Sequence, residues 1–141
     1  MEAPSIVVQT EITAPLEKVW ECWTDPKHIV NWNNASEDWH TPRAENDLQV
    51  GGKFLSRMEA KDGSFGFDFE GTYTDVSVNQ HIVYVLEDDR AVKIEFDSDG
   101  HTTTVTETFV AETQNAVELQ RAGWQAILDN FKRYVEALPA H

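Results

Sequence analysis

The sequence predicts an α+β fold in which a curved antiparallel sheet of about six or seven strands wraps around a long C-terminal helix. Two short helices should follow the first strand. Residues from about 116 to 138 carry apolar side chains at helical spacing, whereas residues 39–110 read as strands and turns. A long helix must bury its apolar stripe, and one face of the sheet is the only large surface available. We expect such an arrangement to leave a cavity between sheet and helix.

The first 30 residues predict a strand and two short helices. Strand Ser5–Ile12 alternates, and one face carries Ile6, Val8, Thr10 and Ile12. Pro15 suits the first turn of a helix and Thr13 is a plausible cap. Asp25-Pro26 ends this helix, and Pro26 can begin a second one.

The middle of the chain predicts a run of strands joined by tight turns. The expected strands are Trp39–Arg43, Lys53–Ala60, Phe65–Val76, His81–Glu87, Ala91–Asp97 and Thr102–Val110. Asp62-Gly63 is a strong hairpin signal between the second and third of these. Gly71 interrupts its strand, which is expected where a sheet bends or another group approaches closely.

The C-terminal helix has clear boundary signals. Asn115 and Glu118 have capping-box spacing, and Pro139 should end the helix. Gly123 in the middle of the helix costs roughly 1 kcal/mol relative to Ala, so we expect it to permit a close approach or a kink. The apolar stripe includes Trp124, Leu128 and Phe131.

Length and composition indicate one domain, residues 1–141, with a full hydrophobic core. The formal net charge of −14 would repel phosphate backbones and anionic lipid headgroups, so no nucleic-acid or membrane partner is expected. The single cysteine, Cys22, excludes an intramolecular disulfide and is expected to be a packed thiol. Without a signal-peptide pattern or a long apolar stretch, the sequence predicts a cytoplasmic protein.

Catalytic signals are weak. His40, in Asp38-Trp39-His40, could act as an acid or base, although a surface or structural role is favoured. Arg57 should lie on the strand face opposite Phe54, Ser56 and Met58, and so in solvent or in an ion pair. If the two faces of this strand were reversed, Arg57 would point inward, and Arg57 and a tyrosine could orient an enolising polyketide. The histidines lack metal-ligand spacing and no phosphate-loop motif occurs, so neither a metal nor a cofactor is expected.

The expected cavity supplies a better candidate site than any catalytic pattern. Apolar side chains of the strands should project toward the helix stripe, and Tyr84 and Ser56 could orient a mostly apolar ligand. Trp32 and Trp39 lie in segments of irregular pattern near the expected opening, where they could form a gate. The candidate ligand-binding residues are Trp32, Trp39, Phe54, Met58, Phe67, Phe69, Tyr84, Trp124, Leu128 and Phe131.

Local signatures along nearly the whole chain resemble one protein family. They are Ile12-Thr13-Ala14-Pro15-Leu16-Glu17-Lys18-Val19-Trp20, Thr24-Asp25-Pro26, Trp32, Val50-Gly51-Gly52-Lys53-Phe54, Phe69-Glu70-Gly71-Thr72-Tyr73 and Arg121-Ala122-Gly123-Trp124. With the order of elements, they resemble the helix-grip (START-like, SRPBCC) superfamily. Within it they are similar to the branch named for the activator of heat-shock protein 90 ATPase homologue.

The resemblance implies a helix-grip fold and leaves three functions open, because the superfamily includes ligand carriers, sensors, cyclases and chaperone partners. The first hypothesis is binding of a small hydrophobic ligand (a lipid, polyketide or flavonoid-like compound) for sensing, carriage or sequestration. The second is a polyketide cyclase or aromatase-like enzyme using His40 or an Arg-Tyr pair. The third is a chaperone ATPase co-activator that acts through its surface, which an exposed apolar patch would favour.

Overall fold

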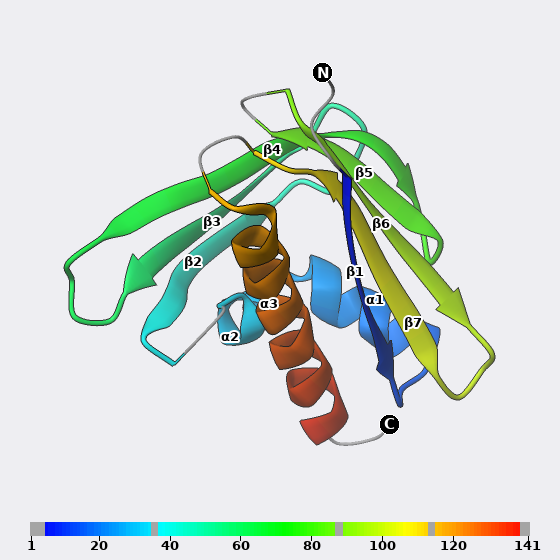
Figure 1. Cartoon of the computed structure of the whole chain (residues 1–141). Coiled ribbons are helices and arrows are strands. Elements are labelled where there is room, and N and C mark those ends of the chain that lie inside the picture. The colour runs from blue at the N-terminus through cyan, green and yellow to red at the C-terminus, as the bar shows by residue number, and fades with distance from the viewer. Residues whose placement is uncertain (1–4, 35–36, 87–88, 113–114, 139–141) are drawn as a thin grey trace.

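Seven antiparallel strands form one curved sheet with the order β1-β7-β6-β5-β4-β3-β2 (Figure 1). The computed structural model describes residues 5–34, 37–86, 89–112 and 115–138. The strands are β1 Ser5–Ile12, β2 Trp39–Asn46, β3 Lys53–Ala60, β4 Gly66–Ser77, β5 His81–Leu86, β6 Ala91–Ser98 and β7 Thr103–Val110. Consecutive strands from β2 to β7 are neighbours, and β1 joins the sheet beside β7.

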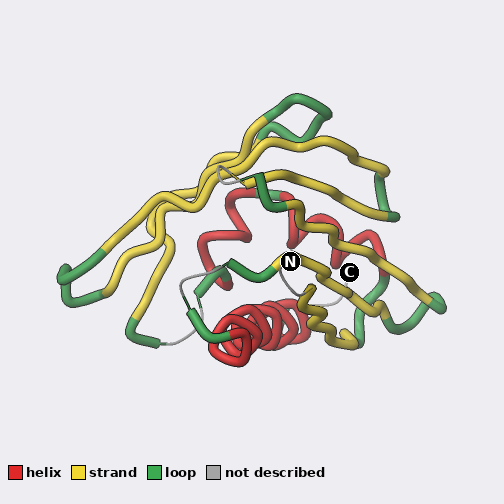
Figure 2. Tube along the Cα trace, turned by 45° about the horizontal axis from the view of Figure 1, so that its top comes forward, coloured by secondary structure: helices red, strands yellow, loops and turns green. Residues whose placement is uncertain are grey.

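Three helices lie on the concave side of the sheet: α1 Leu16–Thr24, α2 Pro26–Trp32 and α3 Val117–Ala137 (Figure 2). The edge strand β1 contacts α3, and the opposite edge strand β2 contacts α2. The helices therefore close the open side of the curved sheet, and the predicted α+β helix-grip fold is confirmed. Within the described residues, none of these helices is long and apolar enough to cross a membrane.

The core lies between α3 and the β1–β7–β6 side of the sheet. The predicted alternation of β1 is confirmed, since its even-numbered residues are buried and its odd-numbered ones are exposed. Leu128, Phe131 and Val135 of α3 are completely buried against this side. Apolar side chains repeat every two residues in the strand and every three to four in the helix, so each element has one apolar surface, and these surfaces pack together.

Both predicted helix caps are wrong. Pro15, not Thr13, is the N-cap of α1, and the Thr13 N–H instead donates to the Glu136 carboxylate at 2.8 Å. The N-cap of α3 is Ala116, which has no side chain capable of capping. Gln120 ties down this end, because its amide nitrogen donates to the Asn115 carbonyl oxygen at 2.9 Å. A partner distant in sequence thus engages the backbone before α1, whereas a side chain of α3 itself holds the backbone before that helix.

Strand boundaries differ little from the predicted ones. β2 extends three residues beyond the expected Arg43, with a register shift between His40 and Arg43. The other predicted strands agree within about one residue at the ends that can be compared. Glu87, the expected end of β5, and Pro139, the expected end of the last helix, lie outside the described residues.

Gly71 and Gly123 differ in the space that surrounds them. At Gly71 a Cβ atom would lie 2.7 Å from the Phe54 ring and 3.0 Å from the Val85 carbonyl oxygen, so the predicted close approach is confirmed. At Gly123 an added Cβ would meet nothing within 4 Å, so the expected close approach is wrong. Gly71 therefore makes room for an aromatic ring, whereas Gly123 has no such packing role.

Candidate ligand-binding cavity

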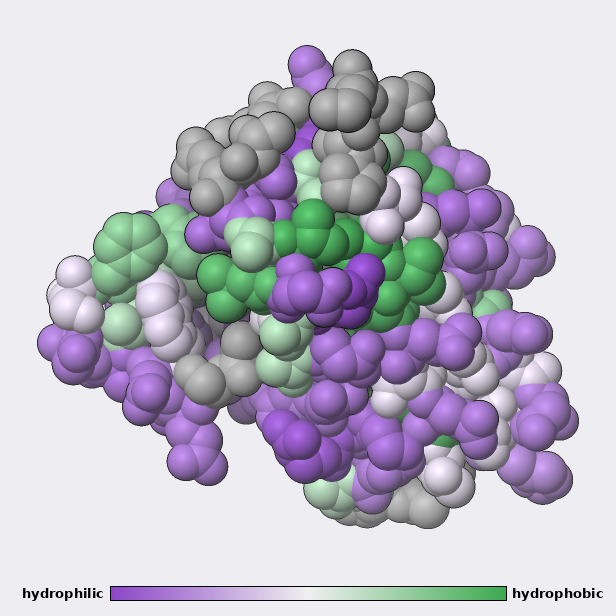
Figure 3. All heavy atoms as spheres, in the orientation of Figure 1, coloured by the Kyte–Doolittle hydropathy of each residue, from purple (hydrophilic) through white to green (hydrophobic). Residues whose placement is uncertain are grey.

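A cavity of about 230 Å³ lies between the sheet and the three helices. It is larger than the ~150 Å³ apolar cavity known to accept benzene, and its size suits a molecule of one or two rings. In Figure 3 hydrophobic residues gather around the first turns of α3, while the lower part of the same face is mostly hydrophilic.

The sheet wall of the cavity consists mainly of aromatic rings. Phe54, Ser56 and Met58 reach it from β3, and Phe67, Phe69 and Tyr73 reach it from β4. The Phe54 ring centre lies 4.6 Å from that of Tyr84 and 5.7 Å from that of Phe69. The space at Gly71 holds the Phe54 ring in this position.

The helices supply three tryptophans to the opposite wall. Trp23 of α1 and Trp32 of α2 have ring centres 5.0 Å apart, and both rings pack edge-on against Phe131. The Trp32 indole nitrogen also donates to the Cys22 carbonyl oxygen at 2.9 Å. Trp124 of α3 stacks on Phe109 at 3.9 Å between ring centres. Each indole is therefore fixed by a neighbour in the core.

One polar chain braces the cavity wall. The Tyr73 hydroxyl donates to the Asn46 side-chain oxygen at 2.5 Å, and the Asn46 amide donates to the Thr24 carbonyl oxygen at 2.6 Å. Burial raises the pKa of Tyr73 above its usual value, so the phenol stays protonated and keeps donating. These two hydrogen bonds link β4, β2 and α1, and they leave Tyr73 and Asn46 with structural roles.

Four other polar residues line the cavity, and their side chains have no hydrogen-bond or ion-pair partner among the described residues. They are Asn33, Ser56, Tyr84 and Glu107. Glu107 is only 4% exposed, and burial raises the pKa of its carboxyl from 4.5 to about 8. Burial also raises the pKa of Tyr84, and the nearby Glu107 adds to this effect. Near neutral pH the cavity therefore presents uncharged hydroxyl and carboxyl groups.

Seven of the ten residues predicted to bind a ligand line the cavity. They are Trp32, Phe54, Met58, Phe67, Phe69, Tyr84 and Trp124. Trp32 does so from the end of α2, not from an irregular segment as expected. Leu128 and Phe131 instead lie completely buried in the core beyond the cavity wall. Trp39, at the start of β2, is also not among the lining residues.

Trp39 belongs to an exposed aromatic cluster, which we define as Trp39, Phe65 and Phe67. Its ring centres lie 6.0 to 6.2 Å apart. Phe65 is 62% exposed and Phe67 is 41% exposed, and Phe67 also touches the cavity. The cluster thus places apolar surface in solvent where β2, β3 and β4 approach the cavity.

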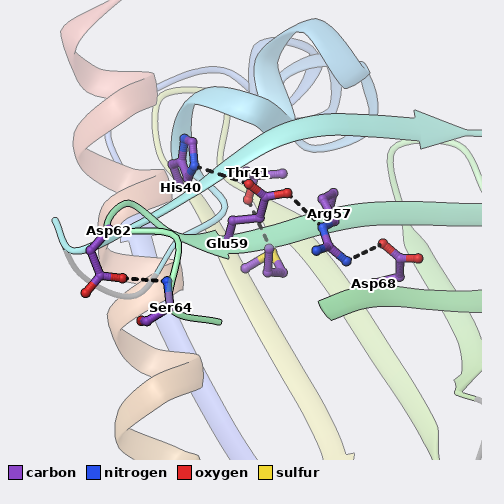
Figure 4. Close-up of polar contacts among 8 residues, drawn as sticks. His40, Thr41, Arg57, Glu59, Asp62, Ser64 and Asp68 are labelled. Carbon is purple, nitrogen blue, oxygen red and sulfur yellow. Dashed lines mark hydrogen bonds and ion pairs between the residues drawn. The ribbon is translucent and has the colours of Figure 1, made fainter. Parts of the chain in front are cut away.

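His40 and Arg57 lie on the outer face of the sheet (Figure 4). Arg57 Nε donates to Glu59 at 2.9 Å and its Nη1 lies 3.4 Å from Asp68, while His40 Nε2 lies 3.8 Å from Glu59. The hydrogen bond to Glu59 is the main reason that the pKa of Arg57 is raised above its usual value. The predicted strand parity is therefore correct, and the reversed parity needed for an Arg57-based cyclase site does not occur.

Two further titratable groups have ordinary structural roles. Cys22 is buried, and burial raises the pKa of its thiol to about 11, which suits the expected packed side chain. Contrary to the sequence expectation of no metal-ligand cluster, ligand atoms of Glu21, Asp25 and His28 lie within 4.8 Å of one another. His28 Nδ1 is hydrogen-bonded to the Tyr134 hydroxyl at 2.6 Å, and Asp25 caps α2. The side chains of Asp25 and His28 are thus both engaged within the protein.

The sequence analysis missed Glu107, although a signal was present. Glu107 is in phase with Val105 and Phe109 on β7, and all three point inward. A carboxylate that shares the apolar face of an alternating strand is unusual enough to be noted. The inward position of Trp23 was also missed as a cavity residue, since its helical spacing indicated only core packing.

Comparison with solved structures places this geometry among known proteins. An AHSA1-like protein from Aeromonas hydrophila has 46% sequence identity and a TM-score of 0.88, over 98% of this chain and 99% of that one. A protein from Cytophaga hutchinsonii also has 46% identity, with a TM-score of 0.81 over 97% and 98% of the two chains. CalU16 from Micromonospora echinospora shares the fold at 20% identity, with a TM-score of 0.69 over 96% and 78%.

The family comparison agrees with the structural one. A search of curated proteins gave no match. The family model described as "Activator of Hsp90 ATPase homolog 1-like protein" matches residues 13–136, which span all three helices and most of the sheet. By this match and the two structures at 46% identity, the chain belongs to the AHSA1 family.

Proposed function

We propose that this protein binds one small hydrophobic molecule in the cavity, for sensing, carriage or sequestration. The observation that carries the proposal is a cavity of about 230 Å³ whose lining includes many aromatic rings and several polar side chains without a partner among the described residues. Ligand sites combine apolar walls with a few polar groups that orient the ligand. The volume favours a molecule of one or two rings over a long-chain lipid or a large polyketide.

A titration followed by amide chemical shifts tests this proposal. The probe is naphthylmethanol, an uncharged two-ring molecule. We expect saturable shifts at Trp23, Trp32 and Trp124, which line the cavity on three helices. Quenching of tryptophan fluorescence should follow the same binding curve.

A matched pair of variants on β3 separates cavity binding from surface adsorption. Ser56→Phe adds a ring inside the cavity at a hydroxyl without a described partner, whereas Leu55→Phe adds a ring on the opposite face of the same strand. We expect Ser56→Phe to lower the affinity for naphthylmethanol at least tenfold and Leu55→Phe to leave it unchanged. Equal affinities in both variants would contradict a cavity site.

The exposed aromatic cluster favours a second candidate function, binding of a chaperone through the surface. Phe65, at 62% exposed, has no packing role that requires a large ring in solvent. Co-sedimentation or an ATPase assay with an Hsp90 chaperone tests it, with Phe65→Ser as the variant. A response of the chaperone that is unchanged by Phe65→Ser would exclude the cluster as the contact.

A further inference from the structure

The most unusual group in the cavity is the Glu107 carboxyl. It is 4% exposed, lines the cavity from β7, and has no hydrogen-bond or ion-pair partner among the described residues. A carboxyl that faces a cavity away from bulk solvent and has no protein partner is costly to ionise. A ligand that supplied the missing partner would offset this cost only when bound.

The acidic residues of the described lining have no basic counterpart. Glu45 and Glu107 are the acidic residues among the described lining residues, and no Lys, Arg or His is present among them. Glu45 is exposed near the rim and pairs weakly with Arg43 at 3.8 Å. The net charge of −14 makes the surroundings of the cavity attract cations and repel anions. The Glu107 carboxyl adds to this attraction only when it ionises. A ligand carboxylate would find neither a cationic partner nor a favourable field.

The aromatic walls point in the same direction. Trp23, Trp32 and Trp124 line the cavity, and the faces of indole rings attract cations. The size of the cavity limits the ligand to one or two rings. The cavity thus combines one buried acid and several indole rings, and no basic residue is among its described lining residues. This combination suits a ligand with a protonated nitrogen on an apolar ring system.

We propose that the cavity binds a small ring-containing amine and that Glu107 is the ionic partner of its nitrogen. This inference rests on the proposed ligand-binding function. The amine arrives as an ammonium ion, the Glu107 carboxylic acid releases its proton to the solvent, and a carboxylate–ammonium pair forms inside the cavity. No other covalent bond changes.

Among the titratable groups around the cavity, Glu107 is the one expected to release a proton when an amine binds. Its neighbours in β1 and β6 are Val8 and Ile94, and the α3 residues that line the cavity are Trp124 and Ile127, none of which titrates. The other titratable lining groups are Tyr73, Tyr84 and Glu45, and Arg90 acts on Tyr84 by its charge. Both tyrosines have pKa values above their usual range and stay protonated near pH 7.

Calorimetry in buffers of different ionisation enthalpy measures the proton. With a carboxyl pKa of about 8, binding of naphthylmethylamine as an ammonium ion at pH 7 should release about 0.9 proton, and at pH 8 about half of that. Naphthylmethanol should bind without proton release, and naphthoic acid should bind at least tenfold more weakly than the amine. Amine binding without proton release at pH 7 would overturn the proposal.

Glu107→Gln is the matched variant, because it keeps the size of the side chain and removes the titrating proton. We expect it to weaken amine binding at least tenfold more than it weakens naphthylmethanol binding, because the alcohol does not need an ionised partner. Glu107→Asp keeps the carboxyl group and should retain proton release. Should the Gln variant not fold, the proton count of the unmodified protein still decides the matter.

The outcomes separate this inference from the function on which it rests. Binding of the alcohol with no preference for the amine would keep the container and overturn the role of Glu107. Failure of all three naphthalene probes to bind would overturn both. Tighter binding of naphthoic acid than of the amine would show that the charge preference is the reverse of the proposed one.

Discussion

The two sides of the sheet differ in how they fill the space beneath them. On the β1–β7–β6 side, branched aliphatic residues such as Ile6, Ile12 and Val105 are completely buried. On the β3–β4 side, the inward positions are mostly aromatic, and Phe67 remains 41% exposed. No residue of β1 lines the cavity, whereas β3 and β4 supply six of the described lining residues. Branched side chains interdigitate, while rigid rings on a curved surface leave space between them.

The largest expected effect tests the filled side. Phe131→Ala removes a completely buried ring that contacts Trp23 and Trp32, and it should lower the free energy of unfolding by about 3–5 kcal/mol. Phe67→Ala, at a partly exposed position on the other side, should cost no more than about 1 kcal/mol. Urea unfolding measures both. Equal costs would break the distinction between the two sides.

The next effect concerns pH. The pKa of the Glu107 carboxyl is about 8 in the folded protein, against 4.5 ordinarily, so the folded state holds this proton more tightly than the unfolded state. The resulting stability is fully present below pH 4.5 and is lost as the pH rises through about 8. Between pH 5 and pH 8 the unmodified protein should lose about 3–4 kcal/mol relative to Glu107→Gln. Parallel stability profiles of the two proteins would contradict a buried carboxyl.

A smaller effect tests how the cavity wall is held. Gly71→Ala would place its Cβ 2.7 Å from the Phe54 ring, and it should cost about 1–3 kcal/mol. Combination with Phe54→Leu should recover part of this cost, because the smaller side chain removes the ring contact. Thermal unfolding of the two single variants and the double variant gives the coupling. Simple additivity would mean that the contact with Phe54 is not the cause.

The smallest expected effect is a gain. An added Cβ at Gly123 of α3 meets nothing within 4 Å, so Gly123→Ala should stabilise the protein by up to about 1 kcal/mol through helix propensity alone. Denaturant unfolding and the naphthylmethanol affinity are the measurements. A loss of affinity without a loss of stability would show that Gly123 serves the cavity.

Much of the fold could be predicted from local patterns. The period-two alternation of Ser5–Ile12, the turn at Asp62-Gly63 and the long apolar stripe of the last helix each have a local cause, and each was correctly placed. The helix caps could not be predicted this way, because Thr13 and the start of α3 use partners far along the chain or beyond the capping position. Local capping rules fail here because Glu136, distant in sequence, holds the backbone before α1, and Gln120 of α3 holds the backbone before that helix.

The sequence by itself determined which residues face inward, since strand and helix periods assign faces without knowledge of the neighbours. Six of the residues assigned to the inner face by these periods, from Phe54 to Trp124, line the cavity. Only the tertiary structure decided that their rings leave about 230 Å³ unfilled and that Leu128 and Phe131 lie beyond the wall. It also decided that the Glu107 side chain has no hydrogen-bond or ion-pair partner among the described residues. Volume and partner geometry depend on elements distant in sequence, whose packing no local pattern encodes.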